Sequence, residues 1–280
     1  HRDDDKSSLG DWYEFKKKIG DMKDLADGIH ALGMKFGLWF EPEMISEDSD
    51  LYRAHPEWVL CVPNRPRCYG RTQLILDFSR PEVVQHLYDV MAGLIGRAGI
   101  DYIKWDMNRN MSDVFSEVLP ADQQGEVAHR YILGVYKLNE MLIDAFPNLL
   151  IEGCSGGGGR FDAGMMYYLP QIWCSDNTNA MERLIIQAGT SLLYPVASMG
   201  AHVNAQHGPA RFIPFETRGN VAMAGTFGYE LDLTKLDEDE QATAIRLNKA
   251  YHRYHDTISE GDYYRLTDMF KVNEVEAWCC

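Results

Sequence analysis

One cycle recurs along this chain: an amphipathic helix, a glycine, a short apolar strand, and then a polar or glycine-rich loop. In the first clear copy, apolar residues between 22 and 29 fall on one helical face, Gly33 stops the helix, and KFGLWF at 35–40 has the composition of a strand. Alternating helices and strands imply a parallel sheet with right-handed crossovers. The cycle therefore predicts an α/β fold.

The same cycle predicts the elements that follow. Ser79 is expected to be the N-cap of a second helix, with Pro81 in its first turn, Glu82 completing the cap, and Gly99 at its end. Further helices are expected near 126–145, 161–168, 180–192 and 237–259, and strands at 101–106, 149–153, 171–176, 192–200 and 220–228.

Polar side chains gather just after one predicted strand after another. They are Glu41 and Glu43, Asp106 and Asn108, Glu152 to Arg160, Asp176 to Asn179, and His202 and Asn204. No GxGxxG segment follows an early strand, which disfavours a dinucleotide-binding open sheet. In the (β/α)8 TIM barrel, many strands contribute side chains to one rim of the barrel, and the active site lies at this rim, at the carboxyl ends of the strands. About six strands are visible where eight close a barrel, so we expect an incomplete one.

The charge of the chain excludes two classes of partner. Its net charge is −15, whereas nucleic acids and anionic membranes require basic surface. No apolar run approaches the roughly 18 residues of a transmembrane helix.

The six cysteines form no zinc-type CxxC pairs. Cys61 and Cys68 could bridge in an oxidising compartment, but reduced thiols are the default for a chain of this size.

Asp106 and Asp176 are placed alike, each at the end of a strand-like run, IDYIKWD and QIWCSD. Glycoside hydrolysis needs two carboxyl groups that face each other, one to attack the anomeric carbon and one to protonate the leaving oxygen. A single strand-end aspartate is more often a cap or a loop hydrogen bonder. However, alternation puts Lys104, Asp106 and Asn108 on one face, and a nearby ammonium favours the ionised carboxylate that a nucleophile requires.

The residues before Asp176 suit the complementary role. Ile172, Trp173 and Cys174 would desolvate its carboxyl group, which favours the protonated form that a proton donor requires. Trp39, at the end of its own strand, fits two roles equally well. It could be packed in the core, or it could be a pocket wall on which the C–H face of a sugar ring stacks.

Two other kinds of site are possible. A metal could be bound if His202, His207, Glu41 and Asp106 met in a barrel, but the chain has no HxH or HExxH pair. The run CSGGGGR at 154–160 resembles a phosphate loop but lacks the Gly-Lys-Ser/Thr ending. Its glycines instead allow a ligand to approach backbone N–H groups closely. Both alternatives are therefore disfavoured.

A series of motifs spans almost the whole chain: LWFEPEM, RTQLILDFSRPEV, YIKWDMNR, IEGCSGGGGRFD, QIWCSDNTNAMERL, YPVASMGAHV and GTFGYELDLTKL. In this order they resemble the bacterial α-galactosidases of glycoside hydrolase family 36. The resemblance implies a retaining hydrolase of terminal α-linked galactose, acting on raffinose-type oligosaccharides and melibiose without metal or cofactor. It also implies a cytoplasmic bacterial enzyme that forms a homodimer or tetramer at full length.

The resemblance also assigns the site residues, motif by motif. Asp106 is expected to be the nucleophile and Asp176 the general acid/base. The expected substrate-binding residues are Lys104 and Asn108 at the galactose hydroxyls, Cys154 and Gly157 near the 2-hydroxyl, Trp39 at the pocket wall, and Arg71 at a further subsite.

Two segments depart from the family pattern. Asn179 stands where family members usually have an aspartate. The loop at 204–212 differs from the usual type, which leaves the roles of Asn204 and His207 open.

The resemblance further predicts that this chain is part of a longer enzyme. Residues 1–268 are expected to be a partial (β/α)8 domain, about strands 3 to 8 of the eight, without the first two strands and the sugar-binding aspartates that precede residue 1. Residues 269–280 are expected to begin a C-terminal β-sandwich domain that is cut short. The isolated chain should be inactive and marginally stable, because an unclosed barrel exposes strand edges. The alternatives are galactosyl transfer to sugar acceptors and a non-catalytic carbohydrate-binding fragment.

Overall fold

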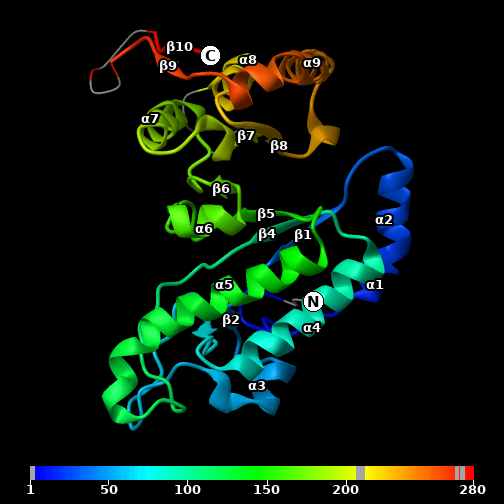
Figure 1. The fold of residues 1–280 in the computed structure, drawn as a ribbon. Helices are drawn as coiled ribbons and strands as arrows, with labels where there is room; N and C mark the ends of the chain where they lie inside the picture. The colour runs from blue at the N-terminus through cyan, green and yellow to red at the C-terminus, as the bar shows by residue number, and fades with distance from the viewer. Residues whose placement is uncertain (1–3, 206–211, 269–270, 272–274) are drawn as a thin grey trace. The chain divides into compact units, whose positions relative to one another are not determined.

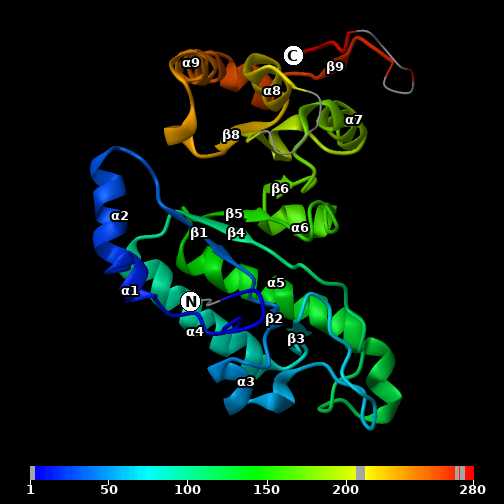
Figure 2. The same ribbon diagram turned by 180° about the vertical axis from the view of Figure 1, so that it is seen from behind.

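The computed structural model describes residues 4–205, 212–268, 271 and 275–280. The chain divides into two compact units, one made of residues 1–156 and 162–169 and the other of residues 157–161 and 170–280. In both units, short parallel strands alternate with helices (Figures 1 and 2). Within the described part of the chain, no helix is long and apolar enough to cross a membrane.

The first unit has a parallel sheet of three strands in the order β1 (Gly37–Phe40), β4 (Tyr102–Trp105) and β5 (Leu150–Gly153). Its helices are α1 (Lys16–Ile19), α2 (Met22–Ala31), α3 (Asp50–Ala54), α4 (Pro81–Ala98), α5 (Val127–Ala145) and α6 (Ala163–Tyr168), with 3-10 turns at Pro56–Trp58 and Ala121–Glu126. A small antiparallel ribbon joins β2 (Met44–Ile45) to β3 (Leu74–Ile75). Both views show α4 and α5 side by side.

The register of this sheet aligns the carboxyl ends of its strands. Trp39 on β1 lies opposite Lys104 on β4, and Lys104 lies opposite Glu152 on β5. The residues that follow β1 and β4, Glu41 and Asp106, therefore emerge at the same edge of the sheet. This is the edge where the polar rim was expected.

The second unit has its own three parallel strands in the order β6 (Gln171–Trp173), β7 (Met199–Asn204) and β8 (Thr226–Glu230). Its helices are α7 (Ala180–Thr190), α8 (Phe215–Ala222) and α9 (Glu238–Glu260), with 3-10 turns at Val196–Ser198 and Leu233–Lys235. A short antiparallel ribbon pairs β9 (Tyr264–Arg265) with β10 (Trp278–Cys279). Helices α8 and α9 pack closely at Gly219. A Cβ at this position would lie only 2.2 Å from the Leu247 side chain, so the close approach requires glycine.

Most of the expected elements are present, and the signals at their ends are informative. Gly33 and Gly99 follow α2 and α4 with φ of 75° and 69°, the left-handed region in which glycine stops a helix. Asp237 caps α9 by accepting a hydrogen bond from the Glu240 amide. The alternation of parallel strands and helices fits an incomplete TIM-like barrel.

Three expectations were wrong in detail. Ser79 is not an N-cap; Arg80 holds that position, and the Ser79 hydroxyl instead donates to Asp77 at 2.5 Å. The strand expected at 192–200 begins only at Met199, because a 3-10 turn follows Pro195. The first part of the strand expected at 220–228 belongs to α8. A short apolar run suits either a strand or the end of a buried helix, and the spacing of its apolar residues does not distinguish the two.

Candidate functional site

Asp106 follows β4 directly and is only 7% exposed. Its Oδ2 accepts hydrogen bonds from the Trp39 indole Nε1 at 3.1 Å and from Asn108 Nδ2 at 2.7 Å, and its Oδ1 accepts one from the Met107 amide at 2.9 Å. The Asp106 amide donates to Phe40 O on the neighbouring strand, at 2.8 Å. Three donors on two oxygens fix the orientation of this carboxylate. The structure thus brings together Trp39, Asp106 and Asn108.

Lys104 lies on the same strand as Asp106, and its ammonium makes an ion pair with Glu152. The Nζ–Oε1 distance is 3.1 Å, and the Glu152 side chain is fully buried. A buried carboxylate requires such a partner, since an uncompensated charge in the interior is costly. Burial, and then Glu152, raises the pKa of the Tyr102 hydroxyl at the other end of β4. Lys104 therefore balances Glu152; its expected action on Asp106 and on a sugar hydroxyl stays a prediction.

The two glutamates that follow β1 hold the neighbouring segments in place. Glu41 is fully buried and accepts hydrogen bonds from the Asn108 amide at 3.0 Å and from Gln73 Nε2 at 3.1 Å. Glu43 is also fully buried and accepts from the Trp105 indole at 2.8 Å and from the Tyr131 hydroxyl at 2.6 Å. Glu41 thereby orients the backbone next to Asp106, and Glu43 ties α5 to β4.

Arg71 lies at the tip of a two-residue turn in the first unit. The backbones of Gly70 and Gln73 exchange hydrogen bonds across this turn, while Arg71 and Thr72 both have positive φ, 52° and 62°. Such left-handed pairs form tight hairpin turns. The Arg71 side chain is exposed there, which leaves it available for a ligand.

Cys154 lies next to the Asp106 segment. It is buried, its amide donates to Trp105 O at 2.7 Å, and its carbonyl accepts from the Met107 amide at 3.1 Å. All six cysteines have free thiols, so the possible bridge between Cys61 and Cys68 is not formed.

Asp176 belongs to the second unit, where it lies three residues beyond the end of β6. Its Oδ1 accepts a hydrogen bond from the Trp173 indole Nε1 at 3.1 Å. Ile172 and Trp173 are buried, but Asp176 itself is exposed. The expected desolvation of its carboxyl group is therefore not observed. What these residues provide is an oriented N–H donor.

The glycine run packs against the Asp176 segment. Gly157 has φ of 85°, and a Cβ there would lie 3.0 Å from the Asp176 amide nitrogen. A Cβ at Gly158 would lie 2.6 Å from the carbonyl oxygen of Cys174. The glycines were expected to make room for a ligand; in the structure they make room for the backbone of residues 174–176. The contact of Gly157 with a sugar stays a prediction.

The described departures from the family pattern fall at the start of α7 and at the end of β7. Asn179 caps α7 by accepting from the Met181 amide at 2.9 Å, and asparagine and aspartate are both good N-caps. Asn204 donates to the Thr178 hydroxyl at 2.8 Å. His207 lies outside the described residues.

The structure places His202 beside an aromatic ring. The His202 ring lies 4.6 Å from that of Trp173, and its Nδ1 lies 3.7 Å from Glu230. In the described part of the chain, no group of three or more potential metal-ligating side chains occurs.

Two partners were missed by the sequence reasoning. Glu152 was noted only as a rim residue, although it neutralises Lys104. Trp173 was taken as an apolar neighbour, although it is a hydrogen-bond donor to Asp176. The sequence did contain a signal for the ion pair: Lys104 and Glu152 lie at the same distance from the ends of two consecutive strands.

Parallel strands that alternate with helices and carry polar side chains at their carboxyl ends fit the β/α-barrel class of proteins. The chain belongs to the Melibiase family, whose sequence profile matches residues 1–261. It is 50% identical to the alpha-galactosidase AgaA of Geobacillus stearothermophilus over 280 residues, which are 99% of this chain and 38% of that protein.

Solved structures give the same assignment. The crystal structure of the alpha-galactosidase from Lactobacillus brevis has a TM-score of 0.96 and 49% identity, covering 99% of this chain and 38% of that one. A GH36 AgaA variant crystallised in complex with raffinose has the same score and identity, covering 99% of this chain and 39% of that one. The chain therefore spans about two fifths of the length of these relatives, 38% in the case of AgaA.

Proposed function

We propose that the protein containing this chain is a retaining α-galactosidase that removes terminal α-linked galactose from raffinose-family oligosaccharides and melibiose. The observation that carries the proposal is the Asp106 carboxylate, which is buried at a strand end and fixed by three donors within a motif of the matched family. Solved relatives with 49% identity were crystallised with raffinose and with stachyose, which supports this substrate class.

The proposed reaction is a double displacement. Asp106 attacks the anomeric carbon as the bond to the glycosidic oxygen breaks, and that oxygen keeps the bonding electrons and takes the proton of the Asp176 carboxyl group. Asp176, now a carboxylate, then removes a proton from water as the water attacks the galactosyl ester and releases Asp106. Two inversions give net retention. A sugar hydroxyl in place of water would give galactosyl transfer by the same steps.

Two of the proposed sugar-binding residues contact the Asp106 carboxyl group directly. Asn108 is already hydrogen-bonded to Asp106, and Trp39 is 38% exposed, which leaves part of its ring for a sugar to stack on. Lys104 and Cys154 are proposed to contact galactose hydroxyls, and Arg71 a further subsite. No metal or cofactor takes part in the proposed steps.

The proposal extends to the domain organisation. Strands β1, β4, β5, β6, β7 and β8 would be strands three to eight of a (β/α)8 barrel within residues 1–268. Residues 269–280 would begin a C-terminal β-domain; β10 within this range pairs with β9, which lies before it. The whole enzyme would act as a homo-oligomer.

The test removes the nucleophile from the full-length enzyme. Asp106→Ala should lower kcat/KM on a nitrophenyl α-galactoside by at least ~1,000-fold. Added azide should restore turnover, because it can attack the anomeric carbon from the side on which the Asp106 carboxylate is missing. The product of this single inversion is the β-galactosyl azide, which an intact double displacement does not produce. Asp101→Asn is the matched control, because Asp101 precedes the same strand at its opposite end. Wild-type activity in Asp106→Ala, or an azide product of retained configuration, would sink the assignment.

A further inference from the structure

We propose that Arg183 is a positioning residue for Asp176: its guanidinium group holds the backbone on both sides of that residue and thereby sets the direction of proton delivery. This inference rests on the proposed acid/base role of Asp176. It assigns a task to Arg183, a helix residue of the QIWCSDNTNAMERL motif to which the resemblance gave no role.

The donors of Arg183 converge on the segment that carries Asp176. Its Nε donates to Asn177 O at 2.8 Å, and one terminal nitrogen donates to Ser175 O at 2.6 Å. The other terminal nitrogen lies 2.9 Å from the Cys174 Sγ atom and 3.1 Å from Gly200 O on β7. The carbonyls immediately before and after Asp176 are thus held by one rigid group, which is itself anchored to the next strand.

The same guanidinium group also controls the side chain that contacts Asp176. The carbon at its centre lies 4.3 Å from the centre of the Trp173 ring, a cation–π contact. Trp173 in turn donates its indole N–H to Asp176 Oδ1. Arg183 therefore acts on Asp176 by two routes, one through the backbone and one through the indole.

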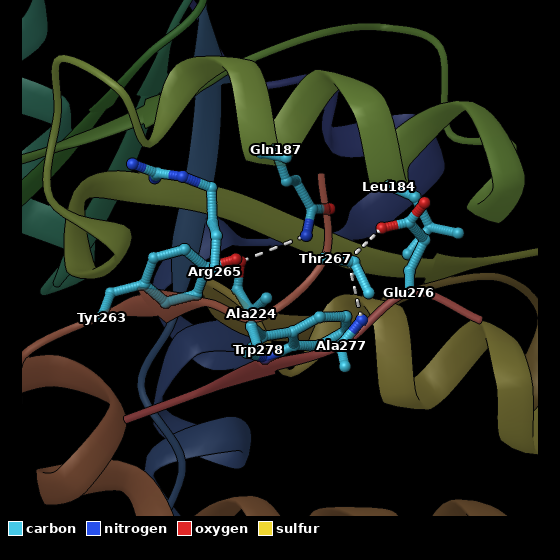
Figure 3. A pocket seen from close by; sticks show the side chains of 10 residues that line it. Leu184, Gln187, Ala224, Tyr263, Arg265, Thr267, Glu276, Ala277 and Trp278 are labelled. Atoms are coloured by element: carbon cyan, nitrogen blue, oxygen red, sulfur yellow. Dashed lines mark hydrogen bonds between the residues drawn. The ribbon is translucent and has the colours of Figure 1, made fainter. Parts of the chain in front are cut away.

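The position of Arg183 on α7 is unusual for a charged residue. It is only 3% exposed, and the other buried residues of this helix are Ala180 and Gln187. Gln187 has a related task elsewhere, since its amide donates to Val221 O at 3.0 Å and to Ala224 O at 3.1 Å, and Figure 3 shows the second of these bonds. The buried face of α7 therefore binds loops through side-chain donors. Arg183 holds the Asp176 loop, and Gln187 holds the last turn of α8 and Ala224 beyond it.

Geometry explains why an arginine is required. A guanidinium group presents its donors in a planar fork, whereas a lysine ammonium is a compact point charge. Lysine can keep the charge but cannot hold Ser175 O, Asn177 O and Gly200 O together. A general acid must lie within hydrogen-bonding reach of the oxygen that it protonates, and a misplacement of ~1 Å is enough to lower the rate about 100-fold.

The experiment compares Arg183→Lys with wild type in the full-length enzyme on two aryl α-galactosides. A nitrophenol leaves without much help from an acid, whereas phenol needs protonation. We expect kcat/KM for the phenyl substrate to fall about 10- to 100-fold more than for the nitrophenyl substrate, part of the ~100- to 10,000-fold that a positioned general acid contributes. Both values come from one preparation, so their ratio does not depend on the fraction of folded enzyme.

Gln187→Met is the matched control, because it removes loop-holding hydrogen bonds of the same helix without touching the Asp176 segment. Its substrate ratio should equal that of wild type. Equal losses on both substrates in Arg183→Lys would overturn the inference and leave Arg183 a merely structural residue. If Arg183→Lys does not accumulate, Trp173→Phe decides: it removes the indole donor to Asp176 and reduces the ring that Arg183 contacts, and it must shift the ratio in the same direction.

Asp176→Ala separates the two levels of the proposal. A large shift of the ratio in Asp176→Ala with none in Arg183→Lys refutes the positioning role alone. No shift in Asp176→Ala refutes the acid/base assignment, and the inference about Arg183 is refuted with it.

Discussion

Tyr131→Phe should destabilise the fold while leaving the chemistry intact. The Tyr131 hydroxyl donates to Glu43 Oε2 at 2.6 Å, and neither residue has any exposed surface. Glu43 also accepts the indole N–H of Trp105, the last residue of β4. Removing one oxygen from α5 therefore withdraws a donor from a carboxylate that water cannot reach.

The magnitude follows from the burial and the charge. A hydrogen bond to a charged group contributes about 1.5–3 kcal/mol, and a buried polar atom deprived of its partner costs about 1–3 kcal/mol. The two figures describe the same lost hydrogen bond and are not added, and Trp105 still donates to the other carboxylate oxygen. We expect the free energy of unfolding to fall by about 2–3 kcal/mol.

Urea unfolding of the full-length protein, followed by tryptophan fluorescence, measures this loss. Tyr136→Phe is the control, since it deletes the same atom from the same helix and its hydroxyl makes no hydrogen bond within the described residues. Below the transition, kcat/KM of both variants should match wild type. A loss in Tyr131→Phe no larger than that in Tyr136→Phe would refute the reasoning.

Two further predictions concern acid stability and the glycine run. The Phe36 amide holds the pKa of Asp101 below its usual value. The Asp101 carboxylate therefore stabilises the fold at pH values above its unfolded pKa of about 3.9. This contribution is lost as the pH falls through the lower pKa that the group has in the folded protein. Asp101→Asn should accordingly flatten the decline of urea stability between about pH 5 and pH 3, and a decline as steep as that of wild type would contradict this. Gly157→Ala should cost about 1–2 kcal/mol through its left-handed backbone and also lower kcat/KM on phenyl α-galactoside, because its Cβ meets the Asp176 amide. Gly156→Ala has the same left-handed backbone but open space around it, so it should lose stability alone; identical kinetics in the two variants would refute the argument.

The fold was predictable wherever one local signal determined an element. Helix α4 has an apolar stripe and ends at Gly99 in the left-handed conformation that the glycine implied. The start of β7 was not predictable, because the run at 192–200 is mostly apolar along its whole length. Pro195 and the 3-10 turn that follows it divide this run, and the division depends on packing that no short window of sequence contains.

The candidate site shows the same division between local and distant causes. Asp106 could be singled out because alternation places it between Lys104 and Asn108 on one face of an otherwise apolar strand, a pattern visible in sequence alone. The ion pair of Lys104 with Glu152 depends on strand register. The contacts of Arg183 depend on how α7 lies against β6 and β7. Arginine on a helix usually lies in solvent, so its burial could be seen only in the structure.

The glycine run has a further consequence for how this chain can be divided. Residues 157–161 belong to the second unit, but residues 162–169, with α6, return to the first. A cut after Gly156 would separate α6 from its own unit, and a cut after Leu169 would leave the glycine run with the wrong half. No single joint separates the two units. Gene fission, fusion or circular permutation between them would therefore require at least two breakpoints, so the two halves of the proposed catalytic pair are expected to be inherited together.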